Sequence, residues 1–221
     1  NGRMGSVFSS FYFRASILNP YLIYSLNELL LKGTKIFTPT LGWSSYAKGF
    51  LESTQVIEYV GTDVIPQVCK KTEQLLKTYN VKSKICCKPS EDLFKSKSFL
   101  KQYKNHFDVV FFSPPYYKLE LYNSDNQSTS RYKDYDDWLK KYWETTIKLC
   151  LHVLEQNGKL CYILSGYGSQ NTTKKYDLIE DMNTITKKYF ELDEIRPMQN
   201  KNVHSTKHRE TGEQIILFHK V

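Results

Sequence analysis

The residues Ser113-Pro114-Pro115-Tyr116 stand where a strongly apolar stretch of this 221-residue chain ends. The preceding run, FDVVFF at 107–112, is rich in β-branched and aromatic residues, which indicates a buried strand. Proline fixes φ and removes a backbone donor, so the two prolines set the direction of the chain after the strand. The corner therefore combines a fixed backbone, a polar side chain and an aromatic face.

Three further features follow predicted strands. The turn Thr38 to Trp43 (TPTLGW) follows the first strand, Asp63 closes the next, and Pro89 to Asp92 (PSED) follows the third. Each feature alone is ordinary, because glycine turns and acidic helix caps are common. In open parallel sheets, however, ligands bind beyond the carboxyl ends of the strands. The common order and spacing of the four features favour one joint site.

Alternating strands and helices are expected to position these residues. The last two strands have no helix between them and are expected to form an antiparallel, hairpin-like addition to the sheet edge, and 117–133 is expected to be a long polar loop. The pattern predicts one α/β domain, 1–221, with a mostly parallel seven-stranded sheet, a terminal antiparallel strand and helices on both faces. The segment 35–43 is expected to be a short strand followed by a glycine-bearing turn. The other expected strands are 56–64, 84–88, 107–112, 159–166, 190–198 and 213–220. The expected helices are 19–33 (capped by Asn19 and ended by Gly33), 45–53, 66–79, 93–104, 134–158 (ended by Gly158) and 175–190.

The order of these features resembles that of class I S-adenosylmethionine-dependent methyltransferases. SPPY resembles the motif of the branch that methylates the amino group of adenine or cytosine in DNA. The resemblance runs from about FYFRASILNP to the last residue and implies a Rossmann-like fold, with the segment 1–33 completing the site of the cofactor S-adenosylmethionine. It implies that Asp63 holds the ribose and that Glu91 or Asp92 meets the adenine amine. The implied cofactor-binding residues are Phe13, Arg14, Thr38, Pro39, Gly42, Trp43, Asp63, Val64, Glu91, Asp92 and Ser113.

The resemblance also implies a catalytic role for the corner. A base amine is a poor nucleophile because its lone pair is delocalised into the ring. If the Ser113 hydroxyl and the Pro114 carbonyl accept its hydrogens, the nitrogen can pyramidalise and attack the methyl group. Tyr116 supplies a face for an extruded base. The implied catalytic residues are Ser113, Pro114, Pro115 and Tyr116.

Two positions depart from the family pattern and keep alternatives open. Thr38 stands where the family usually has an acid, and Ser44 where it commonly has a second glycine. The sequence thus favours a DNA methyltransferase, with adenine slightly preferred over cytosine. An RNA amino-methyltransferase and a non-catalytic DNA-binding subunit are the alternatives, and a homodimer or partner subunit could supply target recognition.

Charge and loop composition favour a nucleic-acid partner. The net charge is +8 and the pI about 9.1, a balance that suits phosphate contacts. His204 and His208 lack a third ligand, so no metal site is expected. The expected nucleic-acid contacts lie in the loop after SPPY and in the basic stretch before the last strand: Tyr117, Arg131, Lys133, Arg196, Lys201, Lys207 and Arg209.

The remaining composition indicates an intracellular protein, cytoplasmic or nuclear. No apolar run approaches membrane-spanning length, and no secretory signal opens the chain. The five cysteines contain no C-x-x-C pair, which favours reduced, mostly buried thiols.

Overall fold

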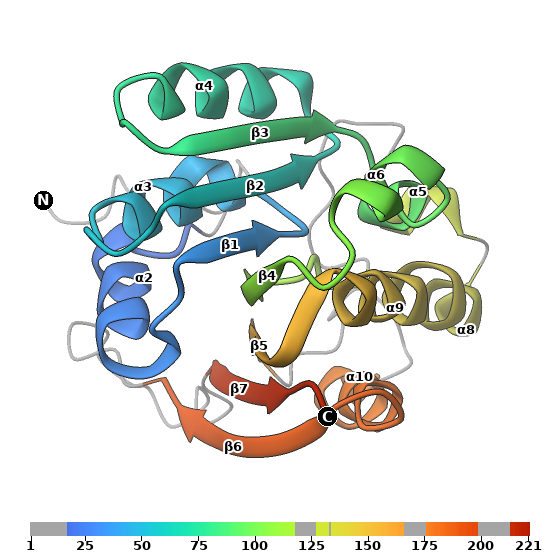
Figure 1. Ribbon diagram of the computed structural model, residues 1–221. Coiled ribbons are helices and arrows are strands. Elements are labelled where there is room, and N and C mark those ends of the chain that lie inside the picture. The colour runs from blue at the N-terminus through green and yellow to red at the C-terminus, as the bar shows by residue number, and fades with distance from the viewer. Residues whose placement is uncertain (1–16, 118–126, 133, 166–175, 199–212) are drawn as a thin grey trace, which may run out of the picture.

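The computed structural model describes residues 17–117, 127–132, 134–165, 176–198 and 213–221. Across these residues seven strands pair into one sheet in the order β3-β2-β1-β4-β5-β7-β6 (Figure 1). The strands are β1 Lys35–Thr38, β2 Glu58–Asp63, β3 Lys82–Cys87, β4 Phe107–Phe112, β5 Leu154–Leu164, β6 Glu191–Pro197 and β7 Gln214–His219. β1 to β5 pair in parallel, and β7 is antiparallel to both of its neighbours. The predicted fold class is confirmed.

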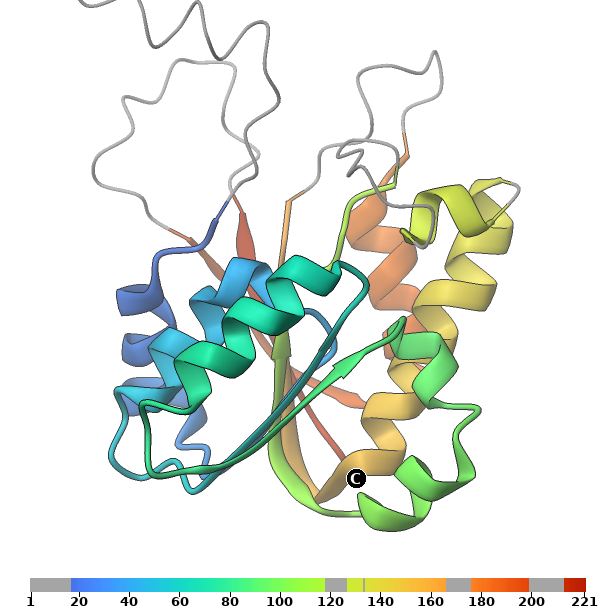
Figure 2. The ribbon, with the colours of Figure 1, turned by 90° about the horizontal axis from the view of Figure 1, so that it is seen from above.

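Helices cover both faces of the sheet, with α2, α3 and α4 on one side and α8, α9 and α10 on the other (Figure 2). The first group comprises α2 Pro20–Leu26, the π-helical turn η1 Asn27–Leu31, the 3₁₀ turn η2 Gly42–Ser44, α3 Ser45–Leu51 and α4 Pro66–Leu76. The second comprises α5 Ser90–Leu93, α6 Lys97–Gln102, α7 Ser128–Arg131, α8 Tyr135–Trp138, the π-helical turn η3 Leu139–Trp143, α9 Glu144–Val153 and α10 Leu178–Thr186. No described helix meets the length and apolarity that a membrane crossing requires.

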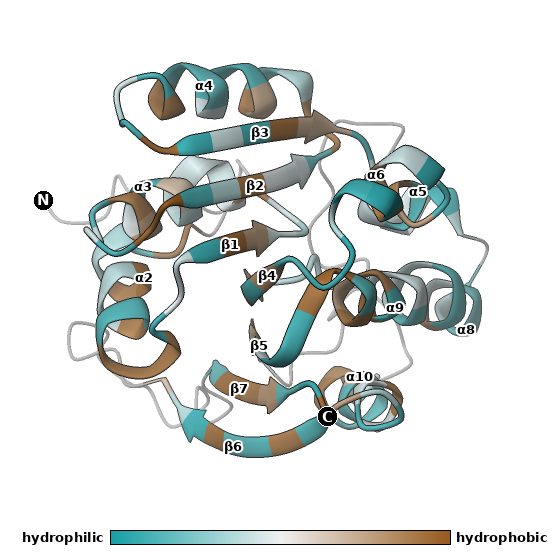
Figure 3. Ribbon diagram, viewed as in Figure 1, coloured by the Kyte–Doolittle hydropathy of each residue, from teal (hydrophilic) through white to brown (hydrophobic). Residues whose placement is uncertain are grey.

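Local sequence explains the main boundaries. The Asn19 side chain accepts a hydrogen bond from the Tyr21 N–H, and Pro20 begins α2, as predicted. Asp134 caps α8 in the same way through the Asp137 N–H. The central strand β4 is buried because it packs between helices on both faces. The helix α4 covers one face of the sheet and is amphipathic. Figure 3 shows its hydrophobic residues toward β3 and its hydrophilic residues on the outer side.

Three boundary predictions are wrong. The long helix ends at Val153 rather than at Gly158, and Leu154 already pairs with Phe107 of β4. Leu154 would be buried in either conformation, so periodicity could not place that boundary. The segment 89–93 is not a simple turn, because Ser90–Leu93 forms α5. Within the expected loop, Ser128–Arg131 forms α7.

The final two strands lie at the edge of the sheet, as expected. In space they stand in the reverse of their order in the chain. β7 is the inner strand and pairs with β5, whereas β6 forms the edge. Because β7 runs against the others, its first residues lie beside the carboxyl ends of the parallel strands. That edge of the sheet carries the candidate site.

Candidate active site

A cavity opens along the carboxyl ends of β1 to β4. The empty space between its lining residues is about 1100 Å³ when the open mouth is included. The structure brings together there ten of the residues that the sequence singled out. They are Pro39, Gly42, Trp43, Asp63, Val64, Glu91, Ser113, Pro114, Pro115 and Tyr116.

The corner Ser113–Tyr116 is fixed by groups from three other segments. The Ser113 N–H donates to the Tyr46 hydroxyl at 3.1 Å, and the Thr40 hydroxyl donates to the Ser113 carbonyl at 3.4 Å. The Tyr116 hydroxyl accepts from the Ser165 N–H at 2.9 Å, which ties the ring to the end of β5. The Ser113 hydroxyl itself makes no hydrogen bond with another described residue, so it remains available to a ligand.

The turn after β1 has an uncommon backbone. Gly42, Trp43 and Ser44 have φ values of 49°, 57° and 72°, so three consecutive residues are left-handed. At Gly42 a side chain would also collide with the Tyr46 ring, since a Cβ atom would lie 2.3 Å from it. Ser44 thus adopts the conformation that glycine favours, and its hydroxyl pairs with Thr72 at 2.7 Å. Ser44 therefore occupies a left-handed position without being a glycine.

Thr38, by contrast, takes no part in the cavity wall. Its side chain is buried, and its hydroxyl pairs with the Tyr59 hydroxyl at 2.7 Å. The prediction that Thr38 contacts the cofactor is therefore wrong, because the last residue of β1 points into the core.

Asp63 presents a preoriented carboxylate. One oxygen accepts from the Leu41 N–H at 3.1 Å, and the other accepts from the Ile65 N–H at 3.0 Å. Burial raises the pKa of the Asp63 carboxyl, while these backbone hydrogen bonds oppose the rise. Each oxygen keeps a lone pair for a further donor, so the group can receive two hydroxyls.

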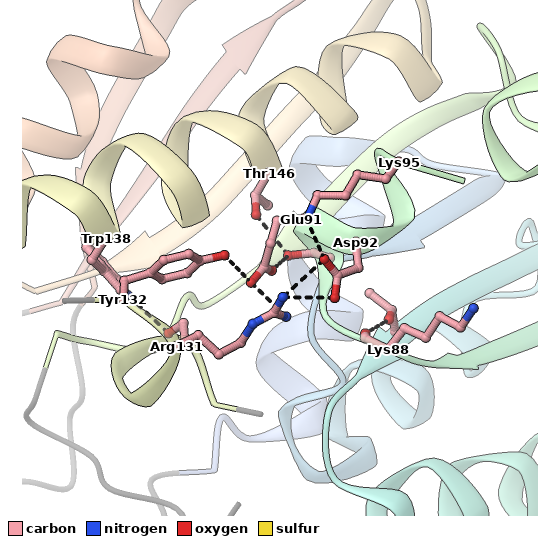
Figure 4. A network of polar contacts seen from close by, with 11 residues as sticks. Lys88, Glu91, Asp92, Lys95, Arg131, Tyr132, Trp138 and Thr146 are labelled. Carbon is pink, nitrogen blue, oxygen red and sulfur yellow. Dashed lines mark hydrogen bonds and ion pairs between the residues drawn. The ribbon is translucent and has the colours of Figure 1, made fainter. Parts of the chain in front are cut away.

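Glu91 and Asp92 are joined to α7 by a network that the sequence did not predict (Figure 4). Arg131 Nη2 lies 3.1 and 2.9 Å from the two Asp92 oxygens, and Nη1 lies 3.1 Å from Glu91 Oε1. The Tyr132 hydroxyl donates to the same Glu91 oxygen at 2.8 Å. Burial acts against the ionised Asp92, but the hydrogen bonds from Lys95 and Arg131 outweigh it and lower the pKa of its carboxyl. Only Glu91 of the two acids lines the cavity.

This network makes Arg131 a structural link, and replacing it with lysine is expected to weaken the fold. Lysine keeps the charge but cannot span two carboxylates as the guanidinium fork does. The loss of about one hydrogen bond should lower the free energy of unfolding by about 1 kcal/mol in urea titrations. Arg196→Lys is the matched control, because Arg196 forms an exposed pair with Glu194 and should change stability by less than about 0.5 kcal/mol. Equal losses in both variants would contradict the role of the network.

The remaining predicted contacts fall in three groups. Tyr117 is 1% exposed and packs against Tyr135, Trp138 and Tyr176, so its predicted contact with nucleic acid is wrong. Arg196 lies exposed near the carboxyl end of β6, outside the cavity. Phe13, Arg14, Lys133, Lys201, Lys207 and Arg209 lie outside the described residues.

Sequence reasoning missed several cavity residues. Tyr46 and Thr40 hold the corner, and Tyr142 and Thr129 line the wall. Tyr142 falls on the apolar stripe of a helix, so its spacing indicates only a core residue. The buried hydroxyls of Tyr142 and Thr129 make no hydrogen bond within the described chain, which suits a cavity whose ligand brings polar atoms. The described residues contain no cluster of potential metal ligands.

Known proteins that resemble this chain include methyltransferases, in sequence family and in fold. The family model described as Eco57I restriction-modification methylase matches residues 21–195. No curated protein matches the chain. Many solved structures share the fold at low identity, and three serve as examples. The N-methyltransferase NodS from Bradyrhizobium japonicum WM9, in complex with S-adenosyl-L-homocysteine, has a TM-score of 0.58 and 14% identity over 90% of this chain and 83% of that one.

The other two structures are of comparable similarity. A predicted O-methyltransferase, Atu636 from Agrobacterium tumefaciens, has a TM-score of 0.59 and 13% identity over 92% of this chain and 81% of that one. TrmN from Thermus thermophilus has a TM-score of 0.59 and 11% identity over 92% of this chain and 49% of that one. At these identities the structures establish the class I methyltransferase fold alone. The family match spans most of the chain, and the chain therefore belongs to the Eco57I restriction-modification methylase family, as a methyltransferase whose methyl donor is S-adenosylmethionine.

Proposed function

We propose that the chain methylates an exocyclic amine of a flipped DNA base, with adenine favoured over cytosine. One observation carries the proposal. The Ser113 hydroxyl, the Pro114 backbone and the Tyr116 ring line the same cavity as the Asp63 carboxylate. An amine acceptor, a stacking face and a ribose-binding acid thus lie within reach of one another. The name of the matching family and the net charge of +8 also support DNA as the substrate.

The residues of the chain position and activate the amine. The Ser113 hydroxyl and the Pro114 carbonyl accept its two hydrogens, which localises the nitrogen lone pair toward the donor. The backbone that carries them is fixed before binding, because Tyr46 and Thr40 hold the Ser113 N–H and carbonyl. When bound, S-adenosylmethionine supplies a methyl group whose S–C bond breaks as the amine lone pair forms the N–C bond, and the surplus proton passes to water.

The acids and the turn bind the donor in this proposal. Asp63 receives the ribose hydroxyls, and the left-handed turn at Gly42 and Trp43 surrounds the methionine part. Glu91, a residue of α5, lines the same cavity. Asp92 is removed from the proposed contacts, because Arg131 and Lys95 occupy its carboxylate. The presence of Gly42, Trp43 and Asp63 on one cavity favours a cofactor-binding enzyme over a non-catalytic subunit.

Nucleoside analysis tests the proposal directly. The protein is incubated with S-adenosylmethionine and unmethylated genomic DNA, or with total RNA, and the products are digested and separated by mass spectrometry. N6-methyl-2′-deoxyadenosine in the DNA digest is the expected product, and N4-methyl-2′-deoxycytidine would keep the chemistry while changing the base. Methylation confined to RNA, or no transfer despite cofactor binding, would overturn the proposal.

Tyr116 offers a test of base capture. Tyr116→Ala should weaken productive DNA binding by about 1–3 kcal/mol, because a stacked base loses its aromatic partner. Tyr116→Phe keeps the face and removes only the hydroxyl that accepts from Ser165, so it is the matched control. Dissociation constants for DNA at saturating S-adenosylhomocysteine measure the difference. If alanine and phenylalanine weaken DNA binding equally, the ring acts through its hydroxyl and not as a stacking face.

A further inference from the structure

Two buried hydroxyls line the cavity without a hydrogen-bond partner in the described chain. They belong to Tyr142 of η3 and Thr129 of α7, which reach the cavity from different elements. Buried polar groups in folded proteins are almost always paired, and those that are not call for an explanation. Two such hydroxyls on one wall point to a ligand that carries hydrogen-bonding atoms at that place.

The helical segment that carries Tyr142 is built to place this side chain. Tyr142 lies in the π-helical turn Leu139–Trp143, between Trp138 and Trp143, which are fully buried. Such turns widen a helix locally and are frequent at functional sites. Burial, followed by the nearby Glu91 carboxylate, raises the pKa of Tyr142 well above its ordinary value. The hydroxyl therefore remains protonated and can donate a hydrogen bond.

Thr129 lies in α7, which the network described above holds in place. Arg131 and Tyr132 anchor the end of α7 to Glu91 and Asp92. Ser90 of α5 is bonded in turn to Thr146 of α9 at 2.8 Å. These links fix α5, α7 and α9 to one another, so the two hydroxyls belong to a rigid wall at the carboxyl end of β3.

The order of the strands decides which part of a nucleoside cofactor meets this wall. β2 lies between β1 and β3, and β4 lies on the other side of β1. A ribose held by Asp63 at the end of β2 and a reacting methyl group near Ser113 at the end of β4 leave the base on the β3 side. Val64, Ile65 and Pro89 provide apolar surface there, as the faces of a purine require.

We propose that the Tyr142 and Thr129 hydroxyls hydrogen-bond the edge of the cofactor's adenine ring and select adenine there. This inference rests on the proposed placement of the ribose at Asp63. Tyr142 donates to a ring nitrogen, and the Thr129 hydroxyl pairs with a neighbouring ring nitrogen or with the exocyclic amine, since adenine presents both acceptors and donors.

The variant Tyr142→Phe tests the inference, because it should stabilise the free protein and weaken ligand binding. Without ligand, removal of an unpaired buried hydroxyl should raise the melting temperature by about 2–4 °C. Binding of S-adenosylhomocysteine and of adenosine alone should both weaken by about 3- to 10-fold in calorimetry, which is the range for one neutral hydrogen bond. The matched control is Tyr162→Phe. The Tyr162 hydroxyl is bonded to Asn183 and Thr186, so its loss should lower the melting temperature and leave adenosine affinity unchanged.

The second variant, Thr129→Val, keeps the side-chain shape and should weaken adenosine binding in the same way. It also preserves the test should Tyr142→Phe fail to fold. Unchanged affinity for adenosine in both variants would overturn the inference. Variants that bind DNA more weakly but adenosine normally would overturn it as well. Wild-type protein that binds S-adenosylhomocysteine but does not methylate DNA would instead refute the proposed function and leave the adenine contact standing.

Discussion

Ser113→Ala is expected to slow methyl transfer by about a hundredfold or more while leaving cofactor affinity unchanged. The loss corresponds to one preorganised partner of the transition state. The structure makes this substitution selective, because the contacts that hold the corner use the Ser113 backbone and not its hydroxyl. Single-turnover rates at saturating S-adenosylmethionine, together with calorimetry of S-adenosylhomocysteine, measure the two quantities separately.

The control for this variant is Ser98→Ala, which removes an exposed hydroxyl of α6. Its rate should equal that of the wild type. A Ser113→Ala enzyme that methylates at the wild-type rate would reduce the SPPY corner to a strand end. In that case the amine would be activated by other groups of the cavity, and the Ser113 hydroxyl would have no part in the reaction.

Asp63→Asn is expected to weaken S-adenosylhomocysteine binding by about 1.5–3 kcal/mol, the range for charge-assisted hydrogen bonds. Unlike alanine, asparagine keeps the side-chain shape beside Leu41 and Ile65. The pKa of Asp63 is raised in the folded protein, so its ionisation opposes folding as pH rises through the interval between the unfolded and folded pKa values. Replacement by a neutral group removes that cost. The amide nitrogen of asparagine cannot accept the N–H that one Asp63 oxygen accepts, so the lost contact should lower the free energy of unfolding by about 1 kcal/mol. Urea titration measures this change beside the calorimetric affinity.

The same pKa shift predicts the direction of pH dependence. Ribose hydroxyls donate to the ionised carboxylate, so wild-type affinity should fall as pH drops through the raised pKa of Asp63. That dependence should be absent in Asp63→Asn. Asp92→Asn is the matched comparison, because its carboxylate bonds Arg131 and Lys95 outside the cavity. Equal affinity losses at both positions would show that neither acid contacts the cofactor directly.

The part of the fold governed by local pattern was predictable from the sequence. Runs such as FDVVFF, the Asn19-Pro20 helix start and Asp63 at a strand end are each read from neighbouring residues. Because parallel strands end at one edge of a sheet, their order alone predicted that Asp63, Gly42 and Ser113 would share a site. The structure places all three on one cavity.

Features that depend on distant contacts were not predictable. Arg131 reads as a free loop cation until α7 brings it to Glu91 and Asp92, which precede it by about 40 positions in the chain. Tyr117 reads as an exposed loop residue until Trp138 and Tyr176 enclose it. The Thr38 side chain is buried, and its hydroxyl is paired with that of Tyr59 in the next strand. In each case the decisive partner lies far away in sequence.

The place of β7 between β5 and β6 has a consequence for the order of folding. β5 gains its second neighbour only when residues 214–219 are available, and β6 has no pairing partner in the sheet until then. The strands β1 to β5 can assemble earlier through their own parallel pairing. Insertion of β7 is thus a late step of high contact order, which is slow relative to local pairing. During synthesis on a ribosome, the edge of β5 that later pairs with β7 would therefore stay exposed until residues 165–219 had been made.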